Sequence, residues 1–364
     1  MIFTIVITFI SIIALLVLHE FGHFIVAKKM GVKVEEFGVG YPPRIFGKKI
    51  GETIYSVNLL PFGAFVKIPG ESGEKSNLED YQSFTGKPVW QRALIMLGGV
   101  VSFWIVAAIL LSIVYGIGAP QAISDEETGP LVNPKIQLIG IASDSPAEEA
   151  GLKAGDAILK FSISNSQFPI TKVKEIHELT EQYQGQEITL TVQRGKEIFD
   201  VSLVPRISPP DGEGAMGVAL ARTAEKSYPW WQCPIKGIQA TASLTLSVIT
   251  GWVDLLGNLI HGQGLPKGVQ FVGPIGIGSL VNQAAQVGMS YFIQFIALIS
   301  IYLAVFNILP IPALDGGKLL FLAIEKIKGS PINRKIEENI TAAFFALLIL
   351  LMIFVTIKDI NRLL

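Results

Sequence analysis

The sequence is poor in cysteine and in charge, and each scarcity excludes a class of protein or site. A single cysteine, Cys233, excludes an intrachain disulfide and a cysteine-based zinc cluster. Only 16% of the 364 residues are charged, 50% are hydrophobic, and the mean hydropathy is +0.50. This composition is too apolar for an ordinary soluble domain and indicates a membrane protein. The formal net charge of -1 shows no excess of basic residues, so we expect no nucleic-acid partner.

Long apolar runs predict helices that cross the lipid bilayer. Crossing takes roughly 20 mostly apolar residues, and four windows meet this need: residues 2–27, 93–118, 289–313 and 340–357. The first window lacks the basic start and the small-residue cleavage site of a signal peptide, so we interpret it as a retained helix. A fifth window, residues 237–253, is uncharged but rich in serine and threonine, and on hydropathy alone it could also cross.

The basic residues outside these windows predict an orientation. Ten Lys and Arg residues follow the first window, five follow the third, and none occurs in the first eighteen residues. Because basic loops stay on the cytoplasmic side, both of these loops should be cytoplasmic. We therefore expect a multi-pass protein of the cytoplasmic (inner) membrane, with both termini and the segment between the second and third windows outside.

That outer segment changes character at residues 128–206. "SPAEEAGLKAGDAIL" predicts a short helix, a Gly-Asp turn and a strand, and "EITLTVQRGKEIFDVSLVPR" predicts a β-hairpin. The arrangement resembles a PDZ domain, a fold that binds extended peptides along a sheet edge; another small β domain is the alternative. His177, on a predicted helix of this domain, is expected to be a solvated surface residue. Residues 207–288 should form an amphipathic linker region.

The stretch "HEFGH" at the end of the first window combines His19, Glu20 and His23. The two histidines are four residues apart, hence on one face of a helix, where they can bind one metal ion while Glu20 takes a proton from the attacking water. The alternative is a pair of packing histidines with a chance glutamate. An ionisable residue inside a span is costly unless it is satisfied, and a metal ion satisfies all three, so we favour the metal.

A third ligand is expected because a catalytic zinc usually has three protein ligands and one open position. His177 and His261 fall outside the spans, which leaves a carboxylate, and Asp315 in "NILPIPALDGG" lies at the edge of the third window. The alternative is a plain turn at "LDGG". Asp315 reaches the histidines only if its span also ends inside. We therefore predict four spans, with residues 237–253 lying on or partly in the membrane surface.

Together these motifs resemble the site-2 protease family of intramembrane zinc metalloproteases. The closest type is the bacterial PDZ-containing branch, the regulator of sigma factor protease type, which cleaves membrane-anchored anti-sigma factors. The resemblance implies zinc on His19, His23 and Asp315, Glu20 as general base, and Asn307 as a residue that positions substrate. Two departures stand out. Ser102 occupies a position where the family often has asparagine, and the chain has room for one PDZ domain instead of two.

Residues 51–68 alternate β-type residues around "LPFG", which contains Gly63, and predict a hairpin between the first two spans. The resemblance implies that this hairpin dips into the membrane and pairs with substrate by strand addition, with Gly63 in contact with it; a plain cytoplasmic hairpin is the alternative. It also implies single-span membrane substrates, anti-sigma factor-like or signal-peptide-like, already shortened outside by a site-1 type protease.

The predicted fold class is an α-helical polytopic membrane protein with four transmembrane helices, a membrane-associated β-hairpin and one inserted β-rich PDZ-like domain. Its membrane core comprises residues 1–127 and 289–364. The alternatives to a protease are a transporter and an inactive scaffolding relative. A transporter would show inverted repeats or a path of intramembrane charges, and neither is visible in the sequence. An inactive scaffolding relative would have lost a ligand or the base, and all four groups are present.

Overall fold

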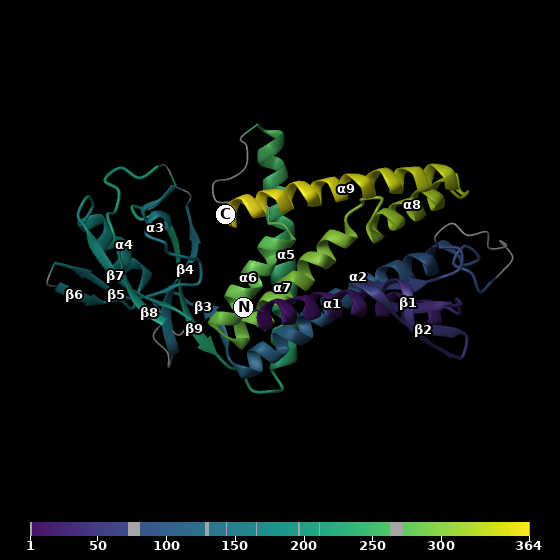
Figure 1. Ribbon diagram of the computed structural model, residues 1–364, viewed down its shortest axis with the longest axis horizontal. Coiled ribbons are helices and arrows are strands. Elements are labelled where there is room, and N and C mark those ends of the chain that lie inside the picture. Colours follow the sequence, from purple (N-terminus) through teal and green to yellow (C-terminus); the bar gives the residue numbers. More distant parts are fainter. Residues whose placement is uncertain are drawn as a thin grey trace.

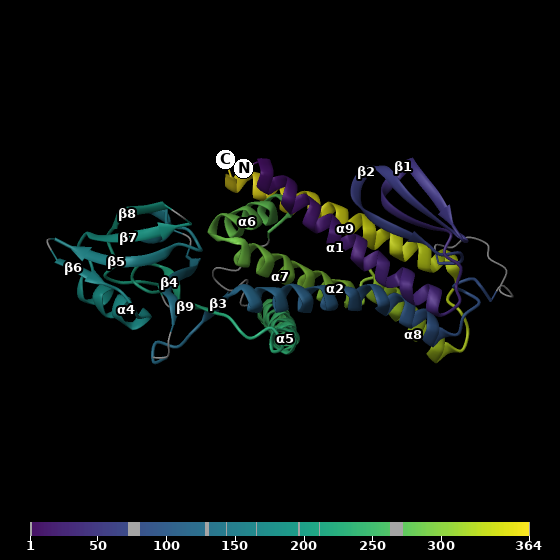
Figure 2. The same ribbon diagram turned by 90° about the horizontal axis from the view of Figure 1, so that it is seen from below.

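The computed structural model describes residues 2–71, 81–127, 131–142, 144–164, 166–195, 197–210, 212–262 and 272–363. Figures 1 and 2 show an elongated molecule in which a β domain forms one end and a β-hairpin with a short helix forms the other. Long helices connect the two ends. Both chain termini lie at the end of this helical part that is nearer to the β domain.

Two antiparallel helices, α1 (Ile2–Lys29) and α2 (Val89–Ile117), form the centre of the helical part. Glycines let their backbones approach closely: a Cβ atom added to Gly22 would lie 2.3 Å from the carbonyl oxygen of Gly98. Small residues at such contacts are typical of helix pairs in membranes. On the other side of α2, α7 (Met289–Ile308) packs closely, and the Ser300 hydroxyl donates a 2.8 Å hydrogen bond to the Phe103 carbonyl.

Among the described residues, five helices are long and apolar enough to cross a membrane, whereas four spans were expected from the sequence. Four correspond to the predicted windows: α1, α2, α7 and α9 (Arg334–Leu363). The fifth is α5 (Cys233–Ile260), which contains the serine- and threonine-rich window. Hydroxyls within α5 donate to carbonyls one turn earlier in the same helix, as Thr241 does to Gly237. Such bonding hides their polarity, so the serine and threonine content does not exclude a membrane environment for α5.

The direction of α5 differs from that of the other long helices. Along the chain α1, α2, α7 and α9 alternate in direction between the two ends of the helical part, whereas α5 runs across them (Figure 1) and is seen almost end-on in Figure 2. Its inner face packs on α2 and α7, where Val248 is buried in one apolar cluster with Leu111 of α2 and Ile301 of α7. Two exposed tryptophans, Trp230 and Trp231, come just before it.

The α7 helix ends at Ile308, before the two prolines of the "NILPIPALDGG" stretch, and a new helix, α8, spans Asp315–Lys328. Proline lacks an amide hydrogen and clashes with the preceding helical turn, so the chain leaves the helix there. The window of residues 289–313 therefore extends beyond the end of α7, and α8 was not among the elements predicted from the sequence. The final helix, α9, is largely exposed. It contacts the rest at its ends, through Thr341, which donates to the Pro312 carbonyl, and through Asp359, which accepts from the Gly276 amide of α6 (Pro274–Val287).

The predicted hairpin is larger than residues 51–68. Its two strands are β1 (Glu36–Ile50) and β2 (Thr53–Lys67). The pairing of β1 with β2 has register shifts, so that the first residues of β1 pair both with the start and with the end of β2. The first part of β1 lies between the two halves of β2, with Phe37 paired to both Tyr55 and Val66. The end of β2 packs against α1, where the Phe62 ring meets Phe9 edge to face with centroids 6.1 Å apart. A large exposed apolar surface remains on the hairpin, including Ile45, Phe46 and Leu59.

The β domain is an antiparallel sheet in the strand order β3-β9-β4-β5-β7-β8, with β6 paired to β5. Its strands are β3 (Ala119–Ala122), β4 (Val132–Ile141), β5 (Ala157–Ile163), β6 (Ser166–Pro169), β7 (Ile188–Arg194), β8 (Glu197–Leu203) and β9 (Val218–Lys226). Helices α3 (Pro146–Glu149) and α4 (Val173–Gln182) accompany it. The predicted hairpin at "RGKE" is present as β7 and β8. The sheet runs from Ala119 to Lys226, a wider range than 128–206, because β3 and β9 join it from the flanking segments.

Candidate metal centre

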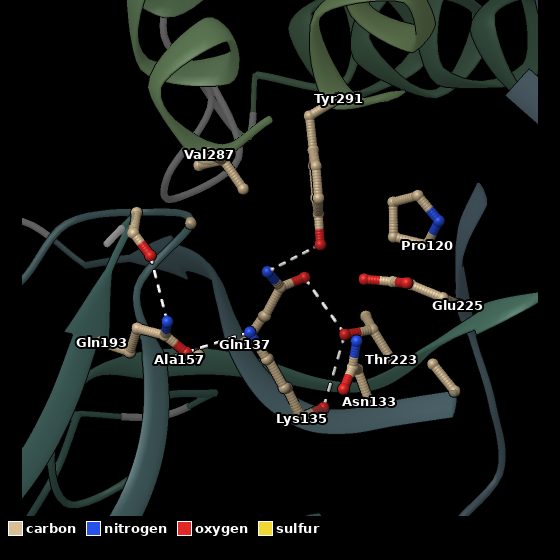
Figure 3. Close-up of a pocket in the computed structure, with 13 residues that line it drawn as sticks. Pro120, Asn133, Lys135, Gln137, Ala157, Gln193, Thr223, Glu225, Val287 and Tyr291 are labelled. Carbon is tan, nitrogen blue, oxygen red and sulfur yellow. Dashed lines mark hydrogen bonds between the residues drawn. The ribbon is translucent and has the colours of Figure 1, made fainter. Parts of the chain in front are cut away.

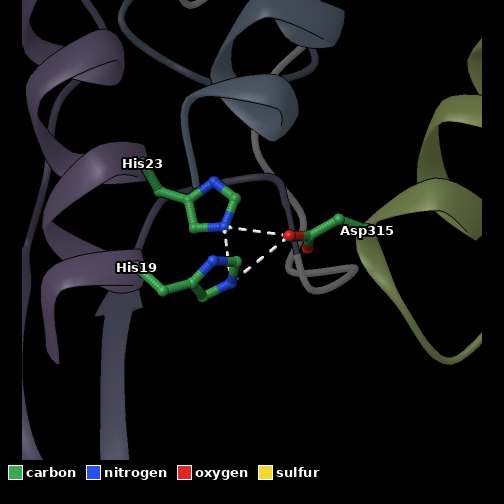
Figure 4. Close-up of side chains that lie close together, drawn as sticks. All are labelled: His19, His23 and Asp315. Carbon is green, nitrogen blue, oxygen red and sulfur yellow. Dashed lines mark hydrogen bonds and ion pairs between the residues drawn. The ribbon is translucent and has the colours of Figure 1, made fainter. Parts of the chain in front are cut away.

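Three side chains from helices far apart in the sequence converge inside the helical part (Figure 4). The Nε2 atoms of His19 and His23 are 3.2 Å apart, and each lies 3.3 Å from Oδ2 of Asp315. Both histidines are buried and come from α1, whereas Asp315 is the first residue of α8. Among the described residues this is the only group of three or more His, Cys, Asp or Glu side chains arranged to hold a metal ion.

The spacing of these atoms fits a zinc ion. Zinc binds His nitrogen and carboxylate oxygen at about 2.0–2.2 Å in a tetrahedron, whose ligand atoms are then about 3.3–3.5 Å apart. The observed separations are 3.2, 3.3 and 3.3 Å. Asp315 Oδ2 is buried and has no hydrogen-bond donor among the described residues, which a bound cation would explain. His19, His23 and Asp315 would hold a zinc ion through three donor atoms, and a zinc ion so held would keep one position for water or substrate.

Helix α2 holds the two histidine rings in place. His23 Nδ1 donates a 2.8 Å hydrogen bond to the Ile95 carbonyl, which leaves its Nε2 free to bind metal. The His19 ring stacks on Phe103 with centroids 4.6 Å apart. Gly99 provides the space for His23, because a Cβ atom at this position would lie 2.1 Å from His23 Nε2. This role of Gly99 depends on the packing of α1 against α2, so no local pattern in the sequence predicts it.

The loop before α8 places Asp315. A Cβ atom on Gly316 would lie 2.1 Å from the Leu309 carbonyl oxygen, and one on Gly317 would lie 2.3 Å from the Ile311 carbonyl oxygen. Only glycine therefore allows the Leu309–Leu314 segment to fold against the first turn of α8. The "LDGG" stretch is thus more than a turn at the end of a span: it starts a helix and directs the carboxylate towards α1.

The remaining predicted site residues have different surroundings. Glu20, adjacent to His19 in α1, is half-buried and within electrostatic range of His23 and Asp315. The Asn307 amide, in the last turn of α7, donates a 2.9 Å hydrogen bond to the Leu303 carbonyl. Gly63 is buried in β2 with a φ of 120°, and a Cβ atom there would approach Tyr41 at 3.3 Å and Leu16 of α1 at 3.8 Å. Gly63 therefore lies beside the Leu16 side chain, and Leu16 is three residues before His19 in α1.

Three further residues named by the sequence analysis lie outside the group. His177 is exposed on α4, and His261 is exposed at the C-terminal end of α5. Neither belongs to the metal-binding group of the described residues. The Ser102 hydroxyl donates a 2.6 Å hydrogen bond to the Gly99 carbonyl of its own helix. Ser102 thus makes a contact within α2, beside the glycine that makes room for His23.

A second polar site lies between the β domain and the helical part (Figure 3). It is a cavity of about 70 Å³, lined by residues of β4, β7 and β9 and by Val287 and Tyr291 of the helical part. Across it the Gln137 side-chain amide donates a 3.1 Å hydrogen bond to the Tyr291 hydroxyl. Tyr291 is in the first turn of α7, at the opposite end of that helix from the loop that places Asp315. This contact fixes the β domain on the helical part, away from the metal-binding group.

Known proteins match the chain along nearly its whole length. The sequence model of peptidase family M50 matches residues 7–351. Regulator of sigma-W protease RasP of Bacillus subtilis is 28% identical over 438 aligned positions, which cover 98% of each chain. Regulator of sigma-E protease RseP of Escherichia coli is 28% identical over 442 positions, covering 96% of each. Zinc metalloprotease RasP of Oceanobacillus iheyensis is 28% identical over 447 positions, covering 99% of each.

All three alignments are longer than the 364 residues of this chain, so they contain segments that this chain lacks. The match nevertheless includes both halves of the metal-binding group, His19 and His23 near its start and Asp315 near its end. The donor set, the tetrahedral spacing and the extent of the match agree with one another. The chain therefore belongs to peptidase family M50, the site-2 protease family of membrane zinc metalloproteases.

Proposed function

We propose that this protein hydrolyses peptide bonds within or near the transmembrane segment of single-span membrane proteins, such as anti-sigma factors or the remains of signal peptides. The observation that carries the proposal is the buried group of His19, His23 and Asp315, with Glu20 beside it, inside the helical part. The relatives named as regulators of sigma factors support the substrate class. A site enclosed by apolar helices suits a peptide bond that is itself presented from the membrane.

In this proposal each residue has one task. His19, His23 and Asp315 hold a zinc ion, which supplies Lewis acidity to the scissile carbonyl and to the attacking water. Glu20 accepts the proton of that water and then delivers it to the departing amine. The hydrogen bond from His23 to Ile95 and the stacking of His19 on Phe103 keep both rings oriented while the substrate changes geometry.

The substrate must be extended at the point of cleavage, because helical amides are bonded within the helix. We propose that the β1–β2 sheet pairs with one strand of the substrate by strand addition. Two observations support this role: Gly63 lies beside the Leu16 side chain of α1, three residues before His19, and the sheet exposes an apolar surface suited to lipid. Asn307, at the end of α7, would position the substrate from the opposite side.

We further propose that the protein lies in the cytoplasmic (inner) membrane with both termini and the β domain outside. The basic loops support this orientation, because they occur at the end that carries β1, β2 and α8. The alternating directions of α1, α2, α7 and α9 support four spans that enclose the site. We propose that α5, which runs across them, lies along the outer membrane surface with Trp230 and Trp231 at the interface.

We propose that the β domain is PDZ-like and screens substrates by the size of what remains outside the membrane. Its place at the outer end, joined to α7 through Gln137 and Tyr291, supports a role in access and not in the chemistry. Substrates would therefore be shortened first by a site-1 type protease. Relative to tandem PDZ domains, one such domain would make this control simpler.

The proposal is tested with purified protein in liposomes and a single-span protein that has a short outer segment. We expect cleavage with zinc present, none after zinc is removed with a chelator, and recovery when zinc is restored. Mass spectrometry of the products should place the cut inside or at the edge of the span. A cut confined to the soluble part of the substrate, or activity that survives complete zinc removal, would refute the proposal.

A further inference from the structure

The helix that starts with Asp315 is tied to its neighbours by two ion pairs outside the metal-binding group. Lys318, one turn after Asp315, forms an ion pair with Glu71, which follows the end of β2. Arg92, in the first turn of α2, forms a bidentate pair with Glu325, ten residues after Asp315, one of its two bonds measuring 3.0 Å. The side chains of Glu71, Arg92 and Glu325 are largely buried, with 11–16% exposed.

The Lys318–Glu71 pair is built into the packing behind the metal-binding histidines. The Glu71 amide donates a 3.2 Å hydrogen bond to the Ile68 carbonyl, so the turn that carries Glu71 is fixed to Ile68. Ile68 is buried in the same apolar cluster as Ile95, whose carbonyl accepts the hydrogen bond from His23. Leu319, the neighbour of Lys318, packs on this cluster too. One cluster therefore touches the end of the hairpin, the partner of His23 and the first turn of α8.

Lys318 remains a cation in this setting. Burial would lower the pKa of its amine, but the Glu71 carboxylate, with further contributions from Asp315 and Glu20, raises the pKa above its ordinary value. The pair is thus ionic at neutral pH. This ion pair joins α8 directly to the segment that follows the β1–β2 hairpin. Without it, the first turn of α8 would keep its glycine contacts to the preceding loop and the apolar contact of Leu319, but lose its charged link to the hairpin segment.

We infer that Lys318 and Glu71 are positioning residues that fix the first turn of α8, so that Asp315 stays within reach of His19 and His23. The inference rests on the proposed ligand set and adds to it a link from the substrate-binding hairpin to one metal ligand. Groups that orient metal ligands commonly change metal affinity about 10–100-fold when they are removed. Loss of either member of this pair should therefore weaken zinc binding by about tenfold or more.

The test separates positioning from the electrostatic effect of the two charges. By charge alone, Glu71→Gln removes a negative group and weakens cation binding, whereas Lys318→Met removes a positive group and strengthens it. Positioning predicts that both variants weaken it. It also predicts that the double variant binds zinc no more weakly than the weaker-binding of the two single variants, because the two residues act as one unit. Lys318→Arg, which keeps the charge and the donor, should retain most of the affinity.

Zinc affinity is measured by competition with a chelator on the full-length protein, and the visible spectrum of the cobalt-loaded protein reports ligand geometry. Glu325→Gln is the matched control, since it breaks a second ion pair of α8, ten residues after Asp315, and should change zinc affinity by less than about threefold, well below the effect of removing a group that orients a ligand. Opposite effects of Glu71→Gln and Lys318→Met, or no effect of either, would overturn the inference. An equal loss in Glu325→Gln would also overturn it, since docking of α8 in general would then be the cause.

Asp315→Ala tests the ligand set separately: zinc binding that survives this substitution refutes the proposed ligands themselves.

Discussion

Replacing Gly99 with alanine tests whether the close contact of α1 and α2 shapes the metal site. The added methyl group would lie 2.1 Å from His23 Nε2 and 2.4 Å from His23 Cε1, whereas ordinary contacts begin at 3.4 Å. The imidazole would have to move by about 1 Å, a displacement that can cost about 100-fold in rate. Zinc–ligand distances tolerate only about 0.2 Å. We therefore expect Gly99→Ala to lose zinc affinity and proteolysis together, by about 100-fold or more.

The ring has little freedom to avoid this clash. Its Nδ1 atom is held by the Ile95 carbonyl at 2.8 Å, and the helices cannot slide apart without losing the contact of Gly22 with Gly98. Helix propensity acts in the opposite direction, because alanine in place of a helical glycine favours the helix by about 1 kcal/mol. A loss of zinc in Gly99→Ala thus cannot be attributed to a weaker α2 helix.

The assay compares zinc content by elemental analysis with cleavage of a single-span substrate, in variants purified side by side. Gly116→Ala is the matched control: it lies in the same helix, and its methyl group would be 3.6 Å from Cys233 Sγ, an ordinary contact. This control should keep zinc and activity. The reasoning is refuted if Gly99→Ala retains full zinc and near-normal turnover, because His23 would then not occupy the position described.

Three further predictions concern the base, the hairpin and the β domain. Glu20→Gln should keep zinc and fold while abolishing cleavage, because an amide cannot accept the proton of water; near-normal turnover would remove Glu20 from the mechanism. Gly63→Val should raise KM for substrate while zinc content stays normal, since a branched side chain is strained at a φ of 120° and meets Tyr41; an unchanged KM would contradict strand addition beside Gly63. Deletion of residues 119–226 should spare cleavage of a substrate with a short outer segment and newly allow a full-length one. A short linker suffices for this deletion because Tyr228 bonds to Tyr115 across the ends. Loss of cleavage of the short substrate, with zinc bound, would instead assign the β domain a role in recruitment.

Local patterns made the metal site predictable from the sequence. His19 and His23 are four residues apart, and in any α-helix two such residues lie on the same face. The prolines before Asp315 end a helix wherever they occur, because proline cannot continue its hydrogen bonding. The structure brings these three residues together as expected. The hairpin turn between β7 and β8 was equally local, since "RGKE" separates two alternating stretches.

The unpredicted features depend on contacts between distant segments. Strand β9 lies between β3 and β4, and its pairs join residues from 77 positions apart (Ile141 and Val218) to 107 positions apart (Ala119 and Lys226), which leaves no local signal. In the sequence, Gly99 is an ordinary small residue of an apolar span, and only the packing of α1 against α2 shows that it makes room for His23. The Lys318–Glu71 pair connects residues 247 positions apart. The hydropathy of α5 is that of a membrane span, whereas α5 runs across the other long helices. Its direction depends on its packing against α2 and α7 and is not encoded in its composition.

The most direct test of the account is the zinc content of the purified protein and of four single variants. We predict one zinc per chain in the wild type, a loss of zinc in His19→Ala, His23→Ala and Asp315→Ala, and full zinc in His261→Ala, because His261 is exposed at the end of α5. Full zinc in Asp315→Ala, or its loss in His261→Ala, would contradict the claim that His19, His23 and Asp315 form the metal centre.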